Sequence, residues 1–349
     1  MICILLATCN GERFLPEFLD SLDRQSLSDW QLLIRDDGST DGTPAILKAA
    51  ARRDPRVVLI HDAAGRLGAA QNFGALLQHA RRLDAEYAFF ADQDDVWQSH
   101  KLEHQLTLVQ QAEAAHGGPQ VPCLLHTDLT VVNESLDTLH PSLAGQAGVA
   151  ADRAEPSPLR LLLSRNFVTG CASVVNRSLM NVALPFPASV VMHDWWTALC
   201  AASFGHVQYV PEPLVLYRQH SGNLVGAVDR WQYLRRIGAG WIRYWKRTMN
   251  DFERGVQQAR ALNGRLREHE EQGNAAELVE SYCRLFDPEH SAWTRFAGMR
   301  RLGVNRSGLL GRMALAARLL GLSNQPADDA DDCPVAGRID GPRPLRKAS

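Results

Sequence analysis

The feature of this sequence that most constrains its fold is a regular alternation of short apolar runs with amphipathic stretches up to about residue 127. Such an order predicts an α/β fold, in which a mostly parallel sheet carries helices on both faces. Apolar runs of the kind expected for buried strands lie at 2–7, 30–36, 56–62, 87–92 and 122–128, and apolar residues at helical spacing lie at 14–25, 43–53, 69–82 and 99–115.

The alternation does not extend over the whole chain, which we divide into three parts. We predict a main domain over 1–225, a helical region rich in basic and aromatic residues over 226–324, and a disordered tail over 325–349, which is rich in Asp, Pro and Gly. Within the main domain the later pattern is mixed, with a helix at 157–164, an apolar stretch at 166–176, a helix from Asp194 to Phe204 and a strand near 206–216.

Composition limits the possible classes of protein. A formal net charge of -2 argues against a general nucleic-acid binder, which is usually clearly basic. The seven cysteines include no C-x-x-C pair, which is typical of a reducing compartment rather than of a disulfide framework or a zinc site. The apolar N-terminal run follows no basic region, and no run approaches the roughly 18 apolar residues of a membrane span. We therefore expect a cytoplasmic protein that is soluble or peripheral on a membrane.

Ligands of parallel α/β sheets bind at the carboxyl ends of the strands, so the turns after each strand deserve most scrutiny. Residues 36–42 read Asp-Asp-Gly-Ser-Thr-Asp-Gly and follow the second predicted strand. Glycine permits close approach of the backbone to a ligand, and aspartate accepts hydrogen bonds from a base N–H or a ribose hydroxyl. The alternative is a polar turn that leads into a helix cap, and the residues alone leave both open.

A second acidic turn, Asp92-Gln93-Asp94-Asp95, directly follows the apolar strand at 87–92. Three carboxylates within four residues repel one another, and Mg²⁺ or Mn²⁺ would offset that repulsion because hard cations prefer oxygen ligands. A cation held there would stabilise a departing diphosphate. The alternative is a solvated acidic turn before the next helix.

Two further groups of polar residues lie in the later part of the main domain. In His193-Asp194-Trp195-Trp196, Asp194 is a candidate general base or a helix N-cap, and the indoles would desolvate it, stack on a sugar or pack in the core. In the stretch from Tyr217 to Asn223, Arg218 beside His220 would contact a diphosphate or complete a metal's ligand set.

Taken together these residues resemble family 2 glycosyltransferases, which have the GT-A fold. The matching pieces, in the family's order, are Thr8-Cys9-Asn10-Gly11-Glu12, Asp36 to Asp41, Asn72-Phe73-Gly74, Asp92 to Trp97, His193 to Trp196 and Tyr217 to His220. The resemblance covers about residues 1–225. More narrowly, LLIRDDGSTDGT, FFADQDDVW, HTDLTVVN and VMHDWWTALCAASFG are similar to bacterial polysaccharide rhamnosyltransferases, which use dTDP-rhamnose.

The resemblance implies roles for individual residues. Asp37 would bond the N3–H of uracil or thymine, Asp92 would lie near the ribose, and Asp194 would be the catalytic base. Asp94 or Asp95 would bind Mg²⁺ or Mn²⁺, with His220 near the metal or the diphosphate. The full set expected to bind the nucleotide sugar is Thr8, Asn10, Glu12, Asp36, Asp37, Asn72, Asp92, Gln93, Arg218 and His220.

The implied reaction is an inverting transfer, in which Asp194 deprotonates an acceptor hydroxyl that attacks the anomeric carbon opposite the nucleotide. The Gln-x-x-Arg-Trp motif and membrane helices of processive members are absent, which indicates single addition. The donor is dTDP-rhamnose or a UDP-hexose. Two rival functions are a nucleotidyltransferase, which would need a basic glycine-rich loop at residues 7–12, and a non-catalytic sugar-nucleotide-binding subunit, which would not need Asp194.

The carboxyl-terminal region suggests a contact with a membrane. Residues 230–247 mix basic residues with Trp and Tyr, and residues 293–322 contain six arginines and no acid. This composition is typical of helices that lie on anionic lipid surfaces, although a solvated helical packing domain explains it equally well. Since many acceptors of the family are lipid-linked at the cytoplasmic face, we predict peripheral association with the inner face of the membrane and a lipid-linked glycan acceptor.

Overall fold

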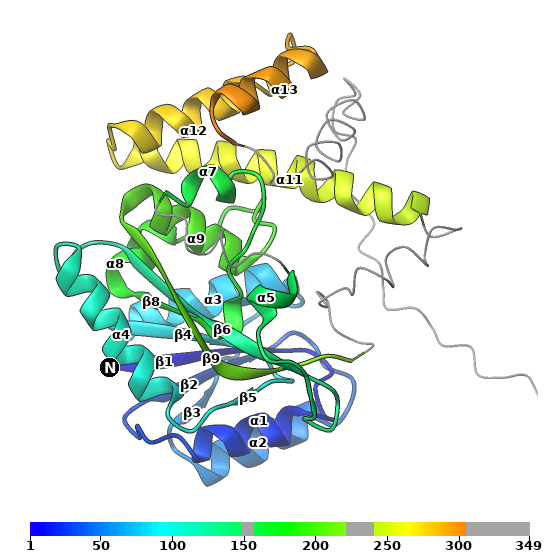
Figure 1. The fold of residues 1–349 in the computed structure, drawn as a ribbon. Helices are drawn as coiled ribbons and strands as arrows, with labels where there is room; N and C mark the ends of the chain where they lie inside the picture. Colours follow the sequence, from blue (N-terminus) through cyan, green and yellow to red (C-terminus); the bar gives the residue numbers. More distant parts are fainter. Residues whose placement is uncertain (148–156, 221–240, 305–349) are drawn as a thin grey trace, which may run out of the picture.

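The computed structural model describes residues 1–147, 157–220 and 241–304. The predicted boundary at residue 225, the tail at 325–349 and the basic residues after 304 lie outside this part of the chain. Helices and strands with loops between them form layers around one large sheet (Figure 1).

The sheet is the centre of the molecule. Its strands follow the order β3-β2-β1-β4-β8-β6-β9-β5, and β7 pairs with β6. The strands are β1 Ile2–Thr8, β2 Gln31–Asp36, β3 Val57–Leu59, β4 Tyr87–Ala91, β5 Val96–Trp97, β6 Cys123–Val132, β7 Thr138–His140, β8 Ser173–Asn176 and β9 His206–Arg218.

Most of these strands run in one direction. β1 pairs parallel with β2 and β4, β2 pairs parallel with β3, and β6 pairs parallel with β9. β8 is antiparallel to both β4 and β6, so that β6 runs in the same direction as β4. The predicted mostly parallel α/β fold is confirmed, and the carboxyl ends of β1, β2, β4, β6 and β9 lie at one edge of the sheet, away from the marked N-terminus (Figure 1).

Both faces of the sheet are covered by helices and carry an apolar core. Successive side chains of a strand point to opposite faces, so each strand contributes to both cores. In β1, Cys3 and Leu5 join one apolar core, and Ile4 and Leu6 join the other. The helices α1 Leu15–Asp23, α2 Thr43–Arg53 and α4 Lys101–Ala115 cover the second face, and α3 Gly68–Arg82, α7 Leu159–Leu162, α8 Arg177–Ala183 and α9 His193–Phe204 cover the first.

The segment from 157 to 192 departs most from the predicted pattern. The apolar stretch at 166–176 is not one element; it holds a loop, the 3₁₀ turn η1 Gly170–Ala172 and the antiparallel strand β8. Helix α8 follows at once, capped by Asn176, whose Oδ1 accepts a hydrogen bond from Leu179 N–H at 2.9 Å. Strand β3 is also shorter than the predicted strand at 56–62, because it pairs only with β2 at the edge of the sheet.

Three helices follow the sheet: α11 Trp241–Glu268, α12 Asn274–Arg284 and α13 Ala292–Arg301. They form a layer over α7 and α9, on the side of the molecule away from α1 and α2 (Figure 1). Leu262 and Val279 are fully buried in the same apolar core as α9, so the sheet and these helices share one core. Arg265 strengthens this contact by donating hydrogen bonds to the carbonyls of residues 182, 184 and 185.

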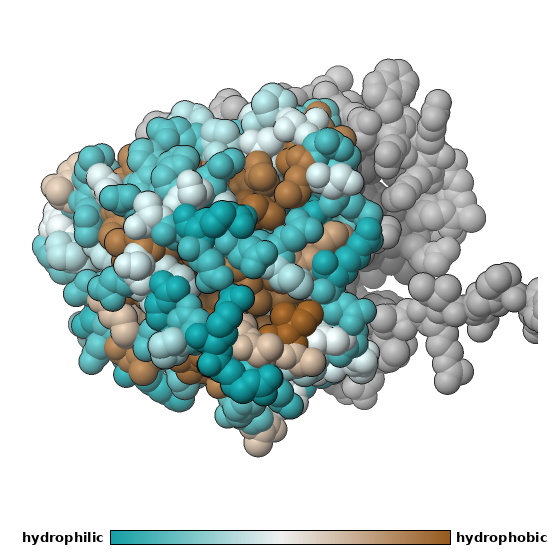
Figure 2. Space-filling model, turned by 90° about the horizontal axis from the view of Figure 1, so that it is seen from below, coloured by the Kyte–Doolittle hydropathy of each residue, from teal (hydrophilic) through white to brown (hydrophobic). Residues whose placement is uncertain are grey.

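The face below α1 and α2 is covered mainly by hydrophilic side chains, with small apolar patches between them (Figure 2). Within the described residues, no helix combines the length and the apolar character needed to cross a bilayer. One short helix, α5 Leu143–Ala147, follows β7 in the sequence and packs near β6.

Candidate active site

Polar side chains from five segments meet at the edge where the parallel strands end. Two of these segments are the turns after β1 and β2, which are joined by their own side chains. The backbone N–H of Thr40 donates to Asn10 Oδ1 at 2.8 Å, and that of Gly42 donates to Glu12 Oε2 at 2.5 Å. Asn10 has φ +50°, a left-handed conformation that Asn adopts more readily than most residues. Asn10 and Glu12 therefore fix the shape of this candidate nucleotide pocket.

The hydroxyl of Thr8, at the end of β1, donates to Asp36 Oδ1 at 3.0 Å. The backbone N–H of Ser39 donates to Asp36 Oδ2 at 2.9 Å, which closes the turn after β2. Thr8 is buried, and Asp36 is half-buried. Both predicted binding residues thus hold the ends of β1 and β2 together beneath the turn.

Asp37 is 7% exposed and accepts three hydrogen bonds. Its Oδ1 accepts from Arg35 Nη1 at 2.9 Å and from Leu67 N–H at 2.7 Å, and its Oδ2 accepts from Gly68 N–H at 2.8 Å. A carboxylate has about four acceptor positions, so one position on Oδ2 is left for a ligand N–H. Asn72 lies behind this group, where its Oδ1 accepts from Arg35 Nη1 at 3.3 Å and its side chain is 1% exposed.

Gln93 connects the end of β4 with the end of β1. Its Oε1 accepts from Cys9 N–H and its Nε2 donates to Cys9 O, each at 3.0 Å. Gly11 is needed beside it, because a Cβ at Gly11 would lie 2.3 Å from Gln93 Oε1. The predicted binding residue Gln93 therefore acts as a brace between two turns of the site.

The acidic turn after β4 places two of its carboxyl groups inward. Ligand atoms of Asp92, Asp95 and Cys171 all lie within 4.8 Å of one another. Burial, followed by the charges of Asp94 and Asp194, raises the pKa of Asp92 to about 7. Burial also raises the pKa of Asp95 well above its ordinary value; its Oδ1 accepts from a backbone N–H, and its buried Oδ2 has no hydrogen-bond partner.

Asp94 points to a different neighbour. Its Oδ2 lies 2.8 Å from His220 Nε2, and the imidazole packs on Phe14 with ring centroids 4.8 Å apart. Asp94 and His220 therefore lie together, whereas Asp95 lies deeper in the protein with no exposed surface.

Arg218 is fully buried at the end of β9, and its guanidinium contacts protein groups. Nε donates to Asp94 O at 2.8 Å, Nη2 pairs with Glu17 Oε2 at 2.6 Å, and Nη1 donates to Glu134 O. Arg218 Cζ also lies 4.5 Å from the centre of the Phe14 ring. The structure thus places Arg218 beneath the acidic turn, where it is fully buried and bonds the Asp94 carbonyl.

Lys101, on α4, is a fully buried amine near the same turn. Its Nζ donates to Gln105 Oε1 at 2.8 Å and lies 3.8 Å from the centre of the Trp97 ring. Burial lowers the pKa of Lys101 to about 7, and the nearby charge of Asp95 opposes this shift. Lys101 therefore adds positive charge near Asp95, whereas Arg218 holds the acidic turn by direct hydrogen bonds.

Asp194 lies in the first turn of α9, which begins at His193 and follows Met192, so Asp194 is not the N-cap. Its Oδ1 accepts from Trp195 N–H at 2.7 Å and from Asn166 Nδ2 at 3.0 Å, and its Oδ2 accepts from Gly170 N–H at 3.1 Å. Burial nevertheless raises the pKa of Asp194 to about 6, against the opposing effect of these hydrogen bonds.

The aromatic neighbours of Asp194 serve packing. Trp196 is fully buried and donates Nε1–H to Ala183 O at 2.8 Å. Trp195 is half-buried and donates to Leu162 O at 2.7 Å. His193 is 3% exposed, and its ring lies 3.8 Å from that of Phe73. Of the two tryptophans, Trp196 belongs to the core, as the sequence allowed for one of them.

Several residues at this edge are not among those predicted from the sequence. Asn166 and Gly170 hold Asp194, Cys171 adjoins the acidic turn, and Arg66 donates to Asp37 O at 3.0 Å across the second turn. Only Arg66 carried a sequence signal, since it follows the third strand at the ligand-binding edge. The others lie in a loop whose position no local pattern reveals.

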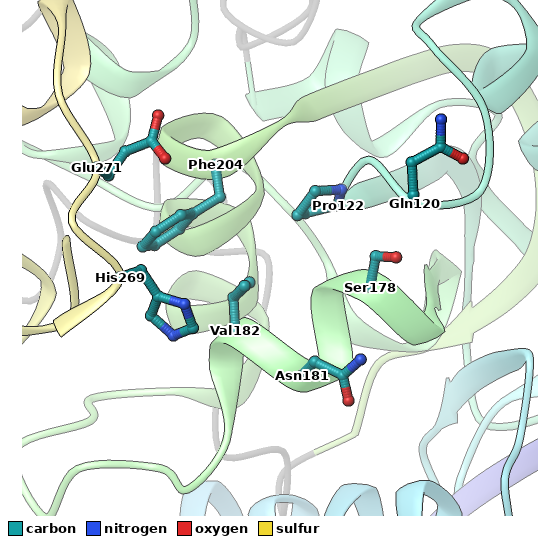
Figure 3. A pocket seen from close by; sticks show the side chains of 8 residues that line it. All are labelled: Gln120, Pro122, Ser178, Asn181, Val182, Phe204, His269 and Glu271. Atoms are coloured by element: carbon teal, nitrogen blue, oxygen red, sulfur yellow. The ribbon is translucent and has the colours of Figure 1, made fainter.

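A separate hollow lies at the opposite end of α9. It has a volume of about 340 Å³ and is lined by Gln120, Pro122, Ser178, Asn181, Val182, Phe204, His269 and Glu271 (Figure 3). Helix α9 carries Asp194 in its first turn and ends at Phe204, so this hollow is remote from the carboxyl edge of the sheet. Ligands of parallel α/β sheets bind at the carboxyl ends of the strands, and the carboxyl groups of Asp92 and Asp95 cluster there. These two observations favour the carboxyl edge over the hollow as the active site.

Comparison with known proteins gives an independent view of this geometry. The family model described as "Glycosyl transferase family 2" matches residues 3–123, about a third of the chain, which includes the turns after β1, β2 and β4. A dTDP-rhamnosyl transferase, RfbG of Shigella flexneri, is 26% identical over 231 residues, 64% of this chain and 74% of that protein.

Two further proteins are similar over different extents. A UDP-Glc:α-D-GlcNAc-diphosphoundecaprenol β-1,3-glucosyltransferase, WfgD of Escherichia coli, is 28% identical over 109 residues, which are 31% of this chain and 41% of that protein. The crystal structure of residues 1–349 of TarS from S. aureus, in complex with UDP-GlcNAc, has a TM-score of 0.53 at 13% identity and covers 91% of this chain and 79% of that one. The predicted resemblance and the predicted fold class are confirmed.

Proposed function

We propose that this chain, whose first third matches family 2 glycosyltransferases and whose fold is GT-A, transfers one sugar from a nucleoside-diphosphate donor to a glycan hydroxyl with inversion. The observation that carries this proposal is the setting of Asp194. A carboxylate held by three hydrogen bonds at the ligand-binding edge, beside the acidic turn, has the position and the basicity that a general base needs.

Burial gives Asp194 a pKa of about 6, so that the group is ionised at neutral pH and yet a stronger base than an exposed aspartate. A base whose pKa lies near the operating pH is the most efficient acceptor of a proton in the transition state. Asp194 takes the proton from the acceptor hydroxyl, and that oxygen attacks the anomeric carbon from the side opposite the diphosphate. Holding donor and acceptor together removes much of the entropic cost of their encounter.

The nucleoside lies against the turns after β1 and β2 in this proposal. Asp37 Oδ2 has one acceptor position left, which suits the N3–H of thymine or uracil. The match to RfbG supports dTDP-rhamnose as the donor, and the shorter match to WfgD supports the alternative of a UDP-hexose. We favour L-rhamnose because the similarity to RfbG extends over 64% of the chain.

The residues of the acidic turn fit a divalent cation. The unpartnered, buried Oδ2 of Asp95 and the raised pKa of Asp92 both indicate negative charge that the protein itself does not fully compensate. The proposed ligands of Mg²⁺ or Mn²⁺ are Asp94, Asp95 and His220, and the carboxyl group of Asp92 lies within 4.8 Å of that of Asp95. The ion would supply positive charge for the leaving diphosphate. Arg218 holds the turn in place through its hydrogen bonds to Asp95 Oδ1 and Asp94 O.

The two rival functions explain the site less well. A nucleotidyltransferase needs a basic, glycine-rich loop after the first strand, and there Glu12 and Asn10 are occupied with the second turn instead. A non-catalytic sugar-nucleotide binder has no use for a buried carboxylate such as Asp194, whose desolvation is unfavourable.

The acceptor in this proposal is a cell-surface polysaccharide or its lipid-linked precursor, and the protein works in the cytoplasm at the inner face of the membrane. The basic and aromatic composition of the carboxyl-terminal region supports this location.

A thermal-shift panel with dTDP-rhamnose, UDP-glucose, UDP-galactose, UDP-GlcNAc and GDP-mannose, each with Mn²⁺ or EDTA, tests the proposal. A ligand that binds only the folded state raises the melting temperature, so the donor that shifts it identifies the nucleotide and the sugar. The Asp194→Asn variant should keep that shift and lose transfer to acceptor. The proposed function would be contradicted if Asp194→Asn still transferred sugar to the acceptor, or if no donor shifted the melting temperature of the wild type.

A further inference from the structure

Helix α13 is fixed on the outside of the helical layer (Figure 1). Its inner face carries Met299, which is fully buried, and Arg295, whose Nη2 donates to Asp287 O at 3.2 Å. Gly298 allows the helix to lie close to α12, because a Cβ there would lie 2.2 Å from Leu285 Cδ2. The orientation of α13 about its own axis is therefore set by packing.

That orientation leaves an aromatic side chain in water. Trp293 is 75% exposed, and Leu139, at 47%, is the next most exposed large apolar side chain among residues 1–147, 157–220 and 252–304. The Trp293 ring stacks with that of Phe296 at a centroid distance of 6.0 Å and an interplanar angle of 30°. Phe296 is half-buried and packs against the apolar core, so its ring holds the exposed Trp293 ring in place on the surface.

Positive charge lies on the same side of the helix. Arg300 is exposed and is seven residues after Trp293, which places both on one face of α13, and Arg301 is exposed beside it. Helix α13 contains no acidic residue, and the sequence from 291 to 324 contains six arginines and no acid, although the chain as a whole has a net charge of -2. Aromatic rings bordered by arginines are complementary to an anionic lipid bilayer, in which negatively charged headgroups cover an apolar acyl region.

We propose that the outer face of α13, formed by Trp293, Phe296, Arg300 and Arg301, docks onto anionic lipid bilayers. The Trp293 ring, with the exposed part of Phe296 beside it, enters the interface between headgroups and acyl chains, where amphipathic indoles are favoured. Arg300 and Arg301 contact the lipid phosphates, to which a guanidinium can donate two hydrogen bonds. This inference deepens the proposed function, on which it rests for the lipid-linked acceptor, by naming the surface that meets the membrane.

Vesicle flotation of the full chain tests the proposal. The vesicles are phosphatidylcholine alone or phosphatidylcholine with about 30% phosphatidylglycerol, at low and high salt. We expect the wild type to float only with anionic vesicles and to be released by salt. Trp293→Ala should weaken partitioning by at least about tenfold, through loss of buried apolar area. Arg300→Gln with Arg301→Gln should weaken it by about fivefold for each charge.

Leu139→Ala is the matched control, because it removes the next most exposed apolar side chain from a different part of the chain and should leave flotation unchanged. Each variant must also keep the wild-type unfolding transition and the donor-induced thermal shift. The proposal would be overturned if Trp293→Ala floated as well as the wild type. It would also be overturned if only changes at Arg306, Arg312 and Arg318 abolished binding. Binding to RNA without binding to anionic vesicles would also overturn it. Failed flotation with an intact donor shift contradicts this docking surface alone, and leaves the proposed sugar transfer standing.

Discussion

Asn166 offers the sharpest test of how the site works, because it donates to the proposed base from a loop distant in sequence. Its Nδ2 lies 3.0 Å from Asp194 Oδ1, while its own Oδ1 accepts from Val168 N–H at 3.0 Å, which fixes the amide orientation. This hydrogen bond favours the ionised carboxylate and lowers its pKa, against the larger, raising effect of burial. Replacing Asn166 by alanine removes that donor and leaves Asp194 buried.

The size of the effect follows from the strength of one hydrogen bond to a charged group, about 1.5–3 kcal/mol in a buried site. Since one pKa unit corresponds to about 1.4 kcal/mol, the pKa of Asp194 should rise by about one to two units from its value of about 6. At pH 7 the ionised fraction then falls from roughly nine-tenths to between about a half and a tenth. Transfer at pH 7 should fall about two- to ninefold, and transfer near pH 9 should recover.

The assay is the pH dependence of kcat with saturating donor and Mn²⁺, so that the charge of Asp92 is compensated in every measurement. Asn181→Ala is the control, because Asn181 is an exposed residue on α8 that bonds Arg81 instead. A loss of activity that is uniform across pH, with the acidic limb unmoved, would refute the reasoning, because the group that titrates would then not be one to which Asn166 donates.

Three more variants test the remaining parts of the site. The folded-state pKa of Asp92 is raised to about 7, so ionisation of this group lowers the free energy of unfolding as the pH rises from about 4 to 7. Asp92→Asn should therefore raise the free energy of unfolding at pH 7.5 by ~1–3 kcal/mol and leave it unchanged near pH 4. Calorimetry in the presence of EDTA measures both values. Asp94→Asn should remove the Mn²⁺-dependent part of the donor-induced thermal shift; a full shift would exclude Asp94 as a ligand. Gly170→Ala would place a Cβ 2.3 Å from His193 Nε2 and should cost about 1–3 kcal/mol in urea unfolding, part of which the added change His193→Ala should restore.

The sequence alone determined the architecture and the edge at which to look for chemistry. Period and length distinguish strands such as β1 and β4 from the helices between them, because both kinds of element are set by local spacing of apolar residues. The order of these elements then implies a parallel sheet, and a parallel sheet implies that the turns at Asp36 and Asp92 share one edge. These steps need only neighbouring residues and general chain geometry.

Only the tertiary structure decided what each polar residue does. Arg218 and Asn72 read from the sequence like ligand contacts, yet both are buried and bonded to protein groups. Asp94 and Asp95 are adjacent in sequence, yet one meets His220 and the other lies fully buried with an unpartnered oxygen. Asn166 and Gly170 carry no sequence signal at all, although they hold Asp194. Burial and hydrogen-bond partners depend on segments far apart in the chain, so no local pattern encodes them, whereas the periodicity that builds the sheet is itself local.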